Sequence, residues 1–387
     1  MATLVFCIFN FQGELNGSLN LAKKLKTLGH QVYYLGLADS RKNVQSHGFE
    51  FLTILETWFP IGFFKQLDFN NVNKWNLISR VLFVRKIKKF IDSLVYGDNK
   101  EIHLIFKQID PDLLILSTTE GAYATFLGLI AHECRLPSIY LTDMFPSLPQ
   151  CKSEKDYHKN NGKEKTLYLH NLRNFLNLYI FENLVEIPLW LLGVNVNYKQ
   201  AIHKLSVKAG VPSERLDLSN NSPLKLTHLF LCPKEFELPS LIRENCCYAE
   251  PSIDLSREQD LDFCWNKLDQ NKKIIYCSLG TTSGTFETLG MSQVKKFFHS
   301  IINCISLFFK SEYQLVIAAS TYIESEFLKI SLNGSDTSKD IVIQQQLPQL
   351  ALLKRSSLAI ISGGIHTVKE CIFWGSHDCF SGLGRSI

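Results

Sequence analysis

The start of the chain alternates between apolar runs and a helical period. Thr3–Asn10 is a run of β-branched and aromatic residues, and Gln31–Leu37 is a second apolar run. Between them, Phe11–Gly17 has the composition of a turn. Apolar residues then recur at helical spacing up to Gly29, namely Leu19, Leu21, Ala22, Leu25 and Leu28. The pattern predicts strand, turn, helix and strand, a βαβ unit that indicates a parallel sheet.

The same alternation recurs further along the chain. Asp112–Leu116 and Ser138–Leu141 are predicted strands on either side of a predicted helix of small residues at Ala122–Cys134. Pro251–Glu258 has the composition of a linker. Beyond it, strands are predicted at Lys273–Ser278, Gln314–Ala319, Asp340–Gln344 and Leu358–Ile361, and helices at Met291–Phe309 and Pro348–Arg355.

Two successive units of this kind predict an α/β protein with two doubly wound domains that face a cleft. The chain has 387 residues. One hydrophobic core stops growing at roughly 250–300 residues, so the length favours the same division. We expect the domains at residues 1–250 and 251–375.

Composition excludes several classes of protein. A net charge of +4 without an Arg/Lys-rich tail does not indicate a nucleic-acid-binding protein. No apolar run approaches the ~18–20 residues of a membrane span, and Met1–Phe9 lacks the features of a signal peptide. Eleven cysteines without a CxxC pair are typical of reduced thiols. We therefore expect a soluble, cytoplasmic protein.

A cationic amphipathic helix is predicted at Asn73–Tyr96. Its apolar positions are Trp75, Ile78, Val81, Leu82, Ile87 and Ile91. The interleaved cations are Arg80, Arg85, Lys86, Lys88 and Lys89. Two interpretations remain open, since the helix can pack on a sheet with a solvated cationic face, or residues 74–91 can touch anionic lipid or substrate peripherally.

A glycine pair between a predicted strand and a predicted helix is the most specific feature. Without a Cβ, Gly363 and Gly364 let the backbone approach a ligand, and the helix N–H groups and dipole favour a phosphate. The upstream Gln349, which follows a proline, strengthens this interpretation. Glu370 lies one helical turn beyond His366, where a carboxylate can accept two ribose hydroxyl protons. A plain strand-to-helix turn and an acid that complements the helix dipole are the alternatives.

Two further turns follow predicted strands. Ser278–Thr282 brings hydroxyl and N–H groups to a strand's carboxyl end, which is a weak signal alone. In the turn after the first strand, Glu14 faces the expected cleft, and Asn16 or Ser18 can cap the next helix. An acid of the capping region is the alternative interpretation of Glu14. The histidines form no metal-binding pattern, because His132 lacks a second histidine one turn away.

With these residues in place, the chain resembles the UDP-glycosyltransferase-type family 1 glycosyltransferases of the GT-B fold. It is most similar to their bacterial macrolide- and carotenoid-glycosyltransferase branch. The resemblance runs from about residue 3 to residue 375 and rests on Gly13-Glu14-Leu15-Asn16, Asp110-Pro111-Asp112, Ser278-Leu279-Gly280-Thr281, Pro348-Gln349 and Gly363-Gly364 with Thr367 and Glu370. The last two motifs match the family's donor-binding signature.

The resemblance implies two Rossmann-like domains, the first for the acceptor and the second for a nucleotide sugar. It implies inverting transfer of a hexose from a UDP or TDP donor to a hydroxyl of a small apolar or lipid-like acceptor, without a metal or other cofactor. Glu14 would be the base. The implied donor-binding residues are Gly280, Thr281, Gln346, Gln349, Ser362, Gly363, Gly364, His366, Thr367 and Glu370.

The chain departs from the family where the chemistry lies. Glu14 occupies the position of the family's catalytic His, and Ser117 that of its Asp partner. Ser362 occupies the position of the phosphate-binding His before the glycine pair. A family Asn falls at His366, and the aromatic that stacks on the nucleotide base falls at Gln346. Together these changes indicate relaxed selection or a different task.

The tail is the last departure. After Gly375 the family continues with Val-Pro, an apolar strand and an Asp-Gln pair for the sugar hydroxyls, whereas residues 376–387 have none of these. Codons for His377–Ser381, shifted by one base, can encode Met-Ile-Val-Phe, and Arg385-Ser386 can lie within Gly-Asp-Gln. We therefore expect an out-of-frame tail and an incomplete second domain, which the gene sequence would test.

Three functions remain open from the sequence. The first is a glycosyltransferase, impaired or not by these changes. The second is a catalytically inactive relative that binds a nucleotide sugar or assists another enzyme, which the missing His and Asp favour. The third is an epimerase or another nucleotide-sugar enzyme of the same fold, which the motif at Pro348-Gln349 disfavours.

Overall fold

The structure is a computed structural model that describes two sheets and most of their helices. The described residues are 1–8, 12–63, 77–97, 100–118, 121–142, 198–218, 223–236, 245–249, 253–255, 263–279, 296–309, 311–319, 340–375 and 377–381. The chain divides into two compact units. The first is Met1–Asn10, Leu25–Leu67 and Val72–Tyr248, and the second is Phe11–Lys24, Asp68–Asn71 and Ala249–Ile387. The predicted division into 1–250 and 251–375 did not foresee that residues 11–24 group with the second unit, and it stays a prediction.

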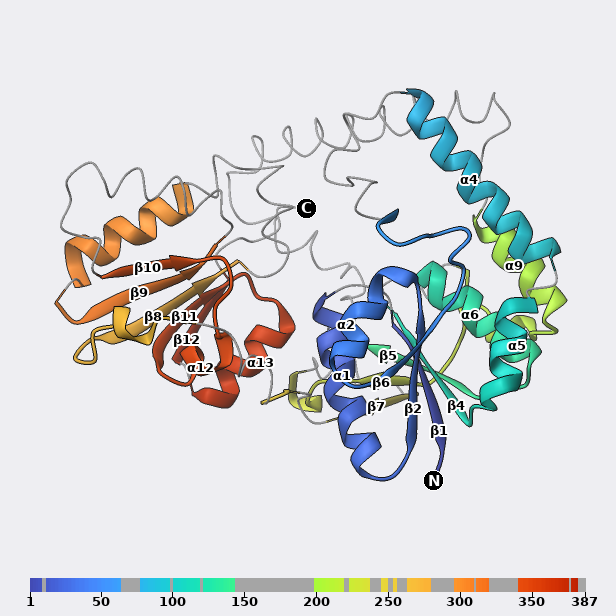
Figure 1. Ribbon diagram of the computed structural model, residues 1–387, viewed down its shortest axis with the longest axis horizontal. Helices are drawn as coiled ribbons and strands as arrows, with labels where there is room; N and C mark the ends of the chain where they lie inside the picture. The colour runs from blue at the N-terminus through green and yellow to red at the C-terminus, as the bar shows by residue number, and fades with distance from the viewer. Residues whose placement is uncertain are drawn as a thin grey trace, which may run out of the picture. The chain divides into compact units, whose positions relative to one another are not determined.

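The first unit is built on a parallel sheet with seven strands in the described part of the chain (Figure 1). They are β1 Thr3–Cys7, β2 Gln31–Gly36, β3 Glu50–Thr53, β4 Leu113–Ser117, β5 Ser138–Thr142, β6 His228–Phe230 and β7 Cys246–Tyr248. Their order is β3-β2-β1-β4-β5-β6-β7, so the winding reverses between β1 and β4. This reversal is the switch point of a doubly wound fold.

Helices cover this sheet over a continuous apolar core. Within the described residues, the helices of the unit are η1 Ala38–Ser40, α2 Arg41–Ser46, α4 Leu77–Tyr96, α5 Lys100–Ile109, α6 Gly121–Glu133, α9 Tyr198–Lys208, η4 Ser213–Arg215 and η5 Lys234–Phe236. Cys7, Leu116 and Tyr140 from three strands pack with Phe106 of α5 and Leu205 of α9. Strands of a covered parallel sheet are buried on both faces, which explains their continuous apolar runs.

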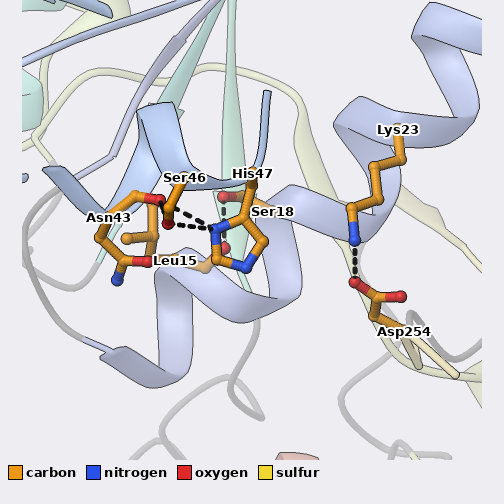
Figure 2. A network of polar contacts seen from close by, with 7 residues as sticks. All are labelled: Leu15, Ser18, Lys23, Asn43, Ser46, His47 and Asp254. Atoms are coloured by element: carbon orange, nitrogen blue, oxygen red, sulfur yellow. Dashed lines mark hydrogen bonds and ion pairs between the residues drawn. The ribbon is translucent and has the colours of Figure 1, made fainter. Parts of the chain in front are cut away.

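Helix α1, Gln12–Thr27, begins earlier than the sequence predicts. The expected turn over residues 11–17 is wrong from residue 12 onward, and Asn16 and Ser18 lie inside the helix instead of capping it. Ser18 donates its hydroxyl to the Leu15 carbonyl oxygen one turn earlier, at 2.8 Å (Figure 2). Leu15 and Leu19 are each 1% exposed. Their burial outweighs the cost of two helical glycines, about 1 kcal/mol each.

The second unit repeats the winding of the first. Its strands are β8 Lys273–Ser278, β9 Tyr313–Ala318, β10 Ile341–Gln344, β11 Ser356–Ile361 and β12 His377–Ser381. They lie parallel in the order β10-β9-β8-β11-β12, so the winding reverses between β8 and β11. Both units are therefore doubly wound, and the predicted α/β class is confirmed.

Apolar residues cover both faces of the second sheet. The helical elements of this unit are η7 Trp265–Lys267, residues 296–304, the π-helix η8 Ile305–Phe309, α12 Gln349–Leu353 and α13 Ile365–Trp374. On one face Tyr276 packs with Leu352 of α12 and Cys371 of α13. On the other, Cys277 packs with Phe298 of the helix 296–304. Successive residues of β8 thus point to opposite faces, as the strand period requires.

The tail has a place in this sheet. Residues 377–381 form β12, which pairs in parallel with β11 through Ala359↔Cys379 and Ile361↔Ser381. Gly375 ends α13 with φ of +66°, a left-handed conformation that glycine adopts without strain. The expectation of an aberrant tail did not foresee this edge strand. The out-of-frame origin of the tail stays a prediction.

The basic helix predicted at 73–96 is described as α4 from Leu77 to Tyr96. Its described apolar side chains lie in or against the core, namely Ile87, Phe90, Ile91, Leu94 and Val95. Arg85 and Lys89 are exposed. This arrangement matches the interpretation of a packed helix with a solvated cationic face. Nowhere in the described ranges does a helix combine the length and the apolar character needed to cross a membrane.

Candidate functional site

The glycine pair forms the turn that the sequence predicts. Strand β11 ends at Ile361, Ser362 is half-buried, and both glycines are exposed before α13 begins. Gly363 has φ of +83°, which disfavours every residue with a Cβ. Gly364 is the N-cap of α13, with φ of −60° and ψ of 127°.

The space beside Gly364 in this turn is open. A Cβ built on Gly364 would meet no atom within 4 Å. Helix α13 is 10 residues long, and the first N–H groups of a helix have no partner within the helix. Together with the positive end of the helix dipole, this turn can hold an anion such as a diphosphate.

The Pro-Gln motif contacts the helix that follows the glycine pair. Gln349, the first residue of α12, donates from Nε2 to Glu370 Oε2 of α13 at 2.5 Å. The same nitrogen lies 3.5 Å from Thr367 Oγ1. Tyr276 of β8 donates its hydroxyl to Gln349 Oε1 at 2.9 Å. Three residues that the sequence places in the donor site, Gln349, Thr367 and Glu370, are thus in contact.

Two other predicted donor residues lie just before α12 and in α13. Gln346 is exposed on the approach to α12, and His366 is half-buried in the first turn of α13. Gly280 and Thr281 lie outside the described residues. Ser278, which ends β8 just before them, is 7% exposed.

Two acidic or basic side chains of α13 are buried. Lys369 is 2% exposed and Glu370 is 3% exposed. Glu370 is therefore buried, and the Gln349 amide donates a hydrogen bond to it. Within the described part of the chain, no group of three or more His, Cys, Asp and Glu side chains could hold a metal ion.

The predicted base and its partner position are both buried. Glu14 lies in the first turn of α1 and is 3% exposed. Ser117, at the position of the family's Asp, ends β4 and is 0% exposed. Later in α1, Lys23 forms an ion pair with Asp254 of the segment 253–255 (Figure 2).

Sequence reasoning missed two sets of polar residues. Tyr276 lies in an apolar run, so its pattern indicates core alone. Thr118 follows β4 and donates its hydroxyl to Thr142 Oγ1 of β5 at 3.1 Å. The carboxyl ends of these neighbouring strands bring the two threonines together. Their position after predicted strands was the available signal.

The buried thiols are poor nucleophiles. Burial raises the pKa of Cys277 to about 12. Burial also raises the pKa of the Cys7 thiol well above its ordinary value. Because the thiolate is the reactive form, neither cysteine is suited to covalent catalysis near neutral pH.

The fold is that of the GT-B glycosyltransferases, which have two doubly wound units. The glycosyltransferase of kitacinnamycin matches with a TM-score of 0.61 at 15% identity, over 97% of this chain and 78% of that one. The calicheamicin glycosyltransferase CalG4 matches at 0.55 and 16%, over 97% and 78%. VinC in complex with dTDP matches at 0.55 and 13%, over 96% and 79%. At these identities the likeness establishes the fold alone.

Two curated proteins are also similar to this chain in amino-acid sequence. NDP-glycosyltransferase YjiC of Bacillus licheniformis is 26% identical over 149 residues, 38% of this chain and 33% of that protein. The uncharacterized UDP-glucosyltransferase YojK of Bacillus subtilis is 24% identical over 131 residues, 34% of this chain and 28% of that protein. The chain thus spans about a third of the curated relatives it matches. No family model matches the sequence. The resemblance to GT-B glycosyltransferases of the family 1 type is confirmed.

Proposed function

We propose that the protein is a glycosyltransferase that takes a sugar, a hexose, from a UDP or TDP donor. The observation that carries this proposal is the contact between Gln349 and Glu370 beside the open glycine turn. It brings both donor motifs of the sequence to one end of the second sheet. VinC, one of the structural neighbours, is described in complex with dTDP.

The glycine turn supports a role on the diphosphate. When the sugar leaves, negative charge develops on the diphosphate, and the N–H groups at the start of α13 would stabilise that charge. As the resemblance implies, Glu370 and Gln349 would provide an acceptor and a donor for ribose hydroxyls, and Glu370, which is 3% exposed, would have to become accessible when the donor binds. We propose that transfer needs no metal ion, so that EDTA leaves turnover unchanged. A loss of turnover that Mg²⁺ restores would contradict this proposal.

On the acceptor side, Glu14 is the proposed base. Its carboxylate would take the proton from an acceptor hydroxyl as that oxygen attacks the anomeric carbon from the face opposite the diphosphate, which inverts the configuration. A small apolar or lipid-like acceptor is the proposed class. The eleven cysteines, which include no CxxC pair, support the cytoplasm as the place of action.

Donor binding without transfer is the second candidate function. Its support is the burial of Glu14 and of Ser117 at the positions of the family's catalytic pair. A base must reach the proton it removes, and a side chain that is 3% exposed reaches it only if the first turn of α1 rearranges.

Two measurements separate these functions. Calorimetric titration with UDP and TDP measures donor binding, and mass detection of the released diphosphate and glycoside measures transfer. Glu14→Gln keeps the shape of the side chain and removes its basicity, so it should lower transfer by about 100-fold or more and leave donor affinity unchanged. Glu50→Gln, at an exposed strand start, is the matched control. Equal transfer by Glu14→Gln and the wild type would exclude Glu14 as the base.

We also propose a peripheral contact between α4 and anionic lipid. Its support is the exposure of Arg85 and Lys89, which are one helical turn apart. Co-sedimentation with phosphatidylserine vesicles at low salt should weaken in the double variant Arg85→Glu, Lys89→Glu. Equal co-sedimentation of the variant would reject the contact.

A further inference from the structure

Among the residues that contact Gln349, Tyr276 belongs to the apolar core of the second sheet. Its side chain is 1% exposed and belongs to the apolar cluster under α12 and α13. A buried phenol is held in place by its ring packing, and its hydroxyl needs a hydrogen-bond partner. Gln349 Oε1 accepts that hydrogen bond at 2.9 Å.

The two ends of the Gln349 amide face opposite kinds of group. A carboxylate can only accept hydrogen bonds, so Glu370 selects the nitrogen end of the amide. Tyr276 donates to the oxygen end. Gln349 itself is half-buried, at the first residue of a helix of five residues. Three rotatable bonds would let such a side chain leave Glu370, and the hydrogen bond from the rigid strand limits that freedom.

We propose that Tyr276 is a positioning residue that holds the Gln349 amide against Glu370 and so presets this pair for the ribose hydroxyls of the donor. The inference rests on the proposed function, because it assigns Glu370 and Gln349 to the ribose. Tyr276 itself would contact neither the ribose nor the sugar. It acts through Gln349 alone, and it therefore affects only ligands whose hydroxyls use the pair.

The test compares UDP with 2′,3′-dideoxyuridine diphosphate, which lacks both ribose hydroxyls. Tyr276→Phe removes one hydroxyl and keeps the ring. It should weaken UDP binding by about 3- to 10-fold, the value of one hydrogen bond, and change dideoxy binding by less than about 2-fold. Tyr313→Phe removes the same atom from a partly exposed ring of β9 and should change neither.

A double-mutant cycle tests the route through Gln349. Gln349→Leu should also reduce the preference for UDP, and adding Tyr276→Phe to it should reduce that preference no further. Additive losses would overturn the inference, because Tyr276 would then act elsewhere. Equal weakening of both nucleotides by Tyr276→Phe would also overturn it, since a general loss of structure has that effect.

The wild-type protein separates this inference from the proposed function. If it binds UDP and the dideoxy nucleotide equally well, the ribose does not use Glu370, and the inference fails while nucleotide binding stands. If it binds neither, both fail. Near-ultraviolet circular dichroism of each variant checks that the packing of the aromatic residues is kept.

Discussion

Exchanging each glycine of the pair for alanine should have opposite consequences. Gly363 has φ of +83°, where a Cβ costs about 1–2 kcal/mol. Gly364 has φ of −60°, and its Cβ would meet no atom within 4 Å. At Gly364 the reduced freedom of the unfolded chain, about 0.4–1 kcal/mol, offsets the poorer N-cap of alanine. Gly363→Ala should therefore destabilise the second unit, and Gly364→Ala should change its stability by less than about 0.5 kcal/mol.

Urea unfolding followed by tryptophan fluorescence measures the difference, since Trp265 and Trp374 lie in this unit. With a slope of about 2 kcal/mol per molar urea, Gly363→Ala lowers the midpoint by about 0.5–1 M. Gly364→Ala keeps the midpoint but places a methyl group on the open side of the turn. It should weaken UDP binding by about 10-fold or more, because a diphosphate there needs close approach to the backbone. A Gly363→Ala midpoint equal to that of the wild type would refute the strain argument.

Three further predictions concern stability. Burial raises the pKa of Cys277 to about 12 in the folded state. The buried neutral thiol therefore contributes fully to the free energy of unfolding below about pH 8.5. Above that pH the thiol ionises in the unfolded chain alone, and this contribution falls by at most about 1.4 kcal/mol per pH unit. Urea midpoints of Cys277→Ala and the wild type should therefore converge as the pH rises. Leu353→Ala, at 0% exposure, should cost about 2–5 kcal/mol in unfolding, whereas the exposed Leu307→Ala should cost less than about 0.5. Asp254→Asn should cost no more than about 1 kcal/mol, since Lys23 is partly exposed; a loss clearly larger than this would contradict the prediction.

Eight strands could be predicted from their apolar runs, whereas β3, β6 and β7, which are short and largely half-buried, could not. β8 and β11 are apolar along most of their length, and a covered parallel sheet requires that. The start of α1 could not be predicted, because its glycines indicate a turn. The helix there is stabilised by the burial of Leu15 and Leu19, which the local sequence does not show. β12 could not be predicted from the sequence for a related reason. Its residues have no apolar alternation, and its place depends on pairing with β11.

The site divides in the same way. The turn at Gly363 follows from local composition, because only glycine suits its backbone. The contact between Gln349 and Glu370 was suggested by two separate motifs, and the fold brings them together. Tyr276 could not be found from the sequence, since its role depends on which strand faces α12. A buried tyrosine in an apolar run is indistinguishable from core until its hydroxyl has a partner.

The reversal of winding in each sheet also bears on how the chain folds. β1 pairs with β2 on one side and with β4 on the other, and β4 comes only after two long helices. β8 likewise cannot complete its pairing until β11 has been synthesised. Contacts between segments so distant in sequence form slowly. During synthesis on the ribosome, the central strand of each unit therefore keeps one unpaired edge until β4 or β11 has been made, and such transiently unpaired edges favour aggregation.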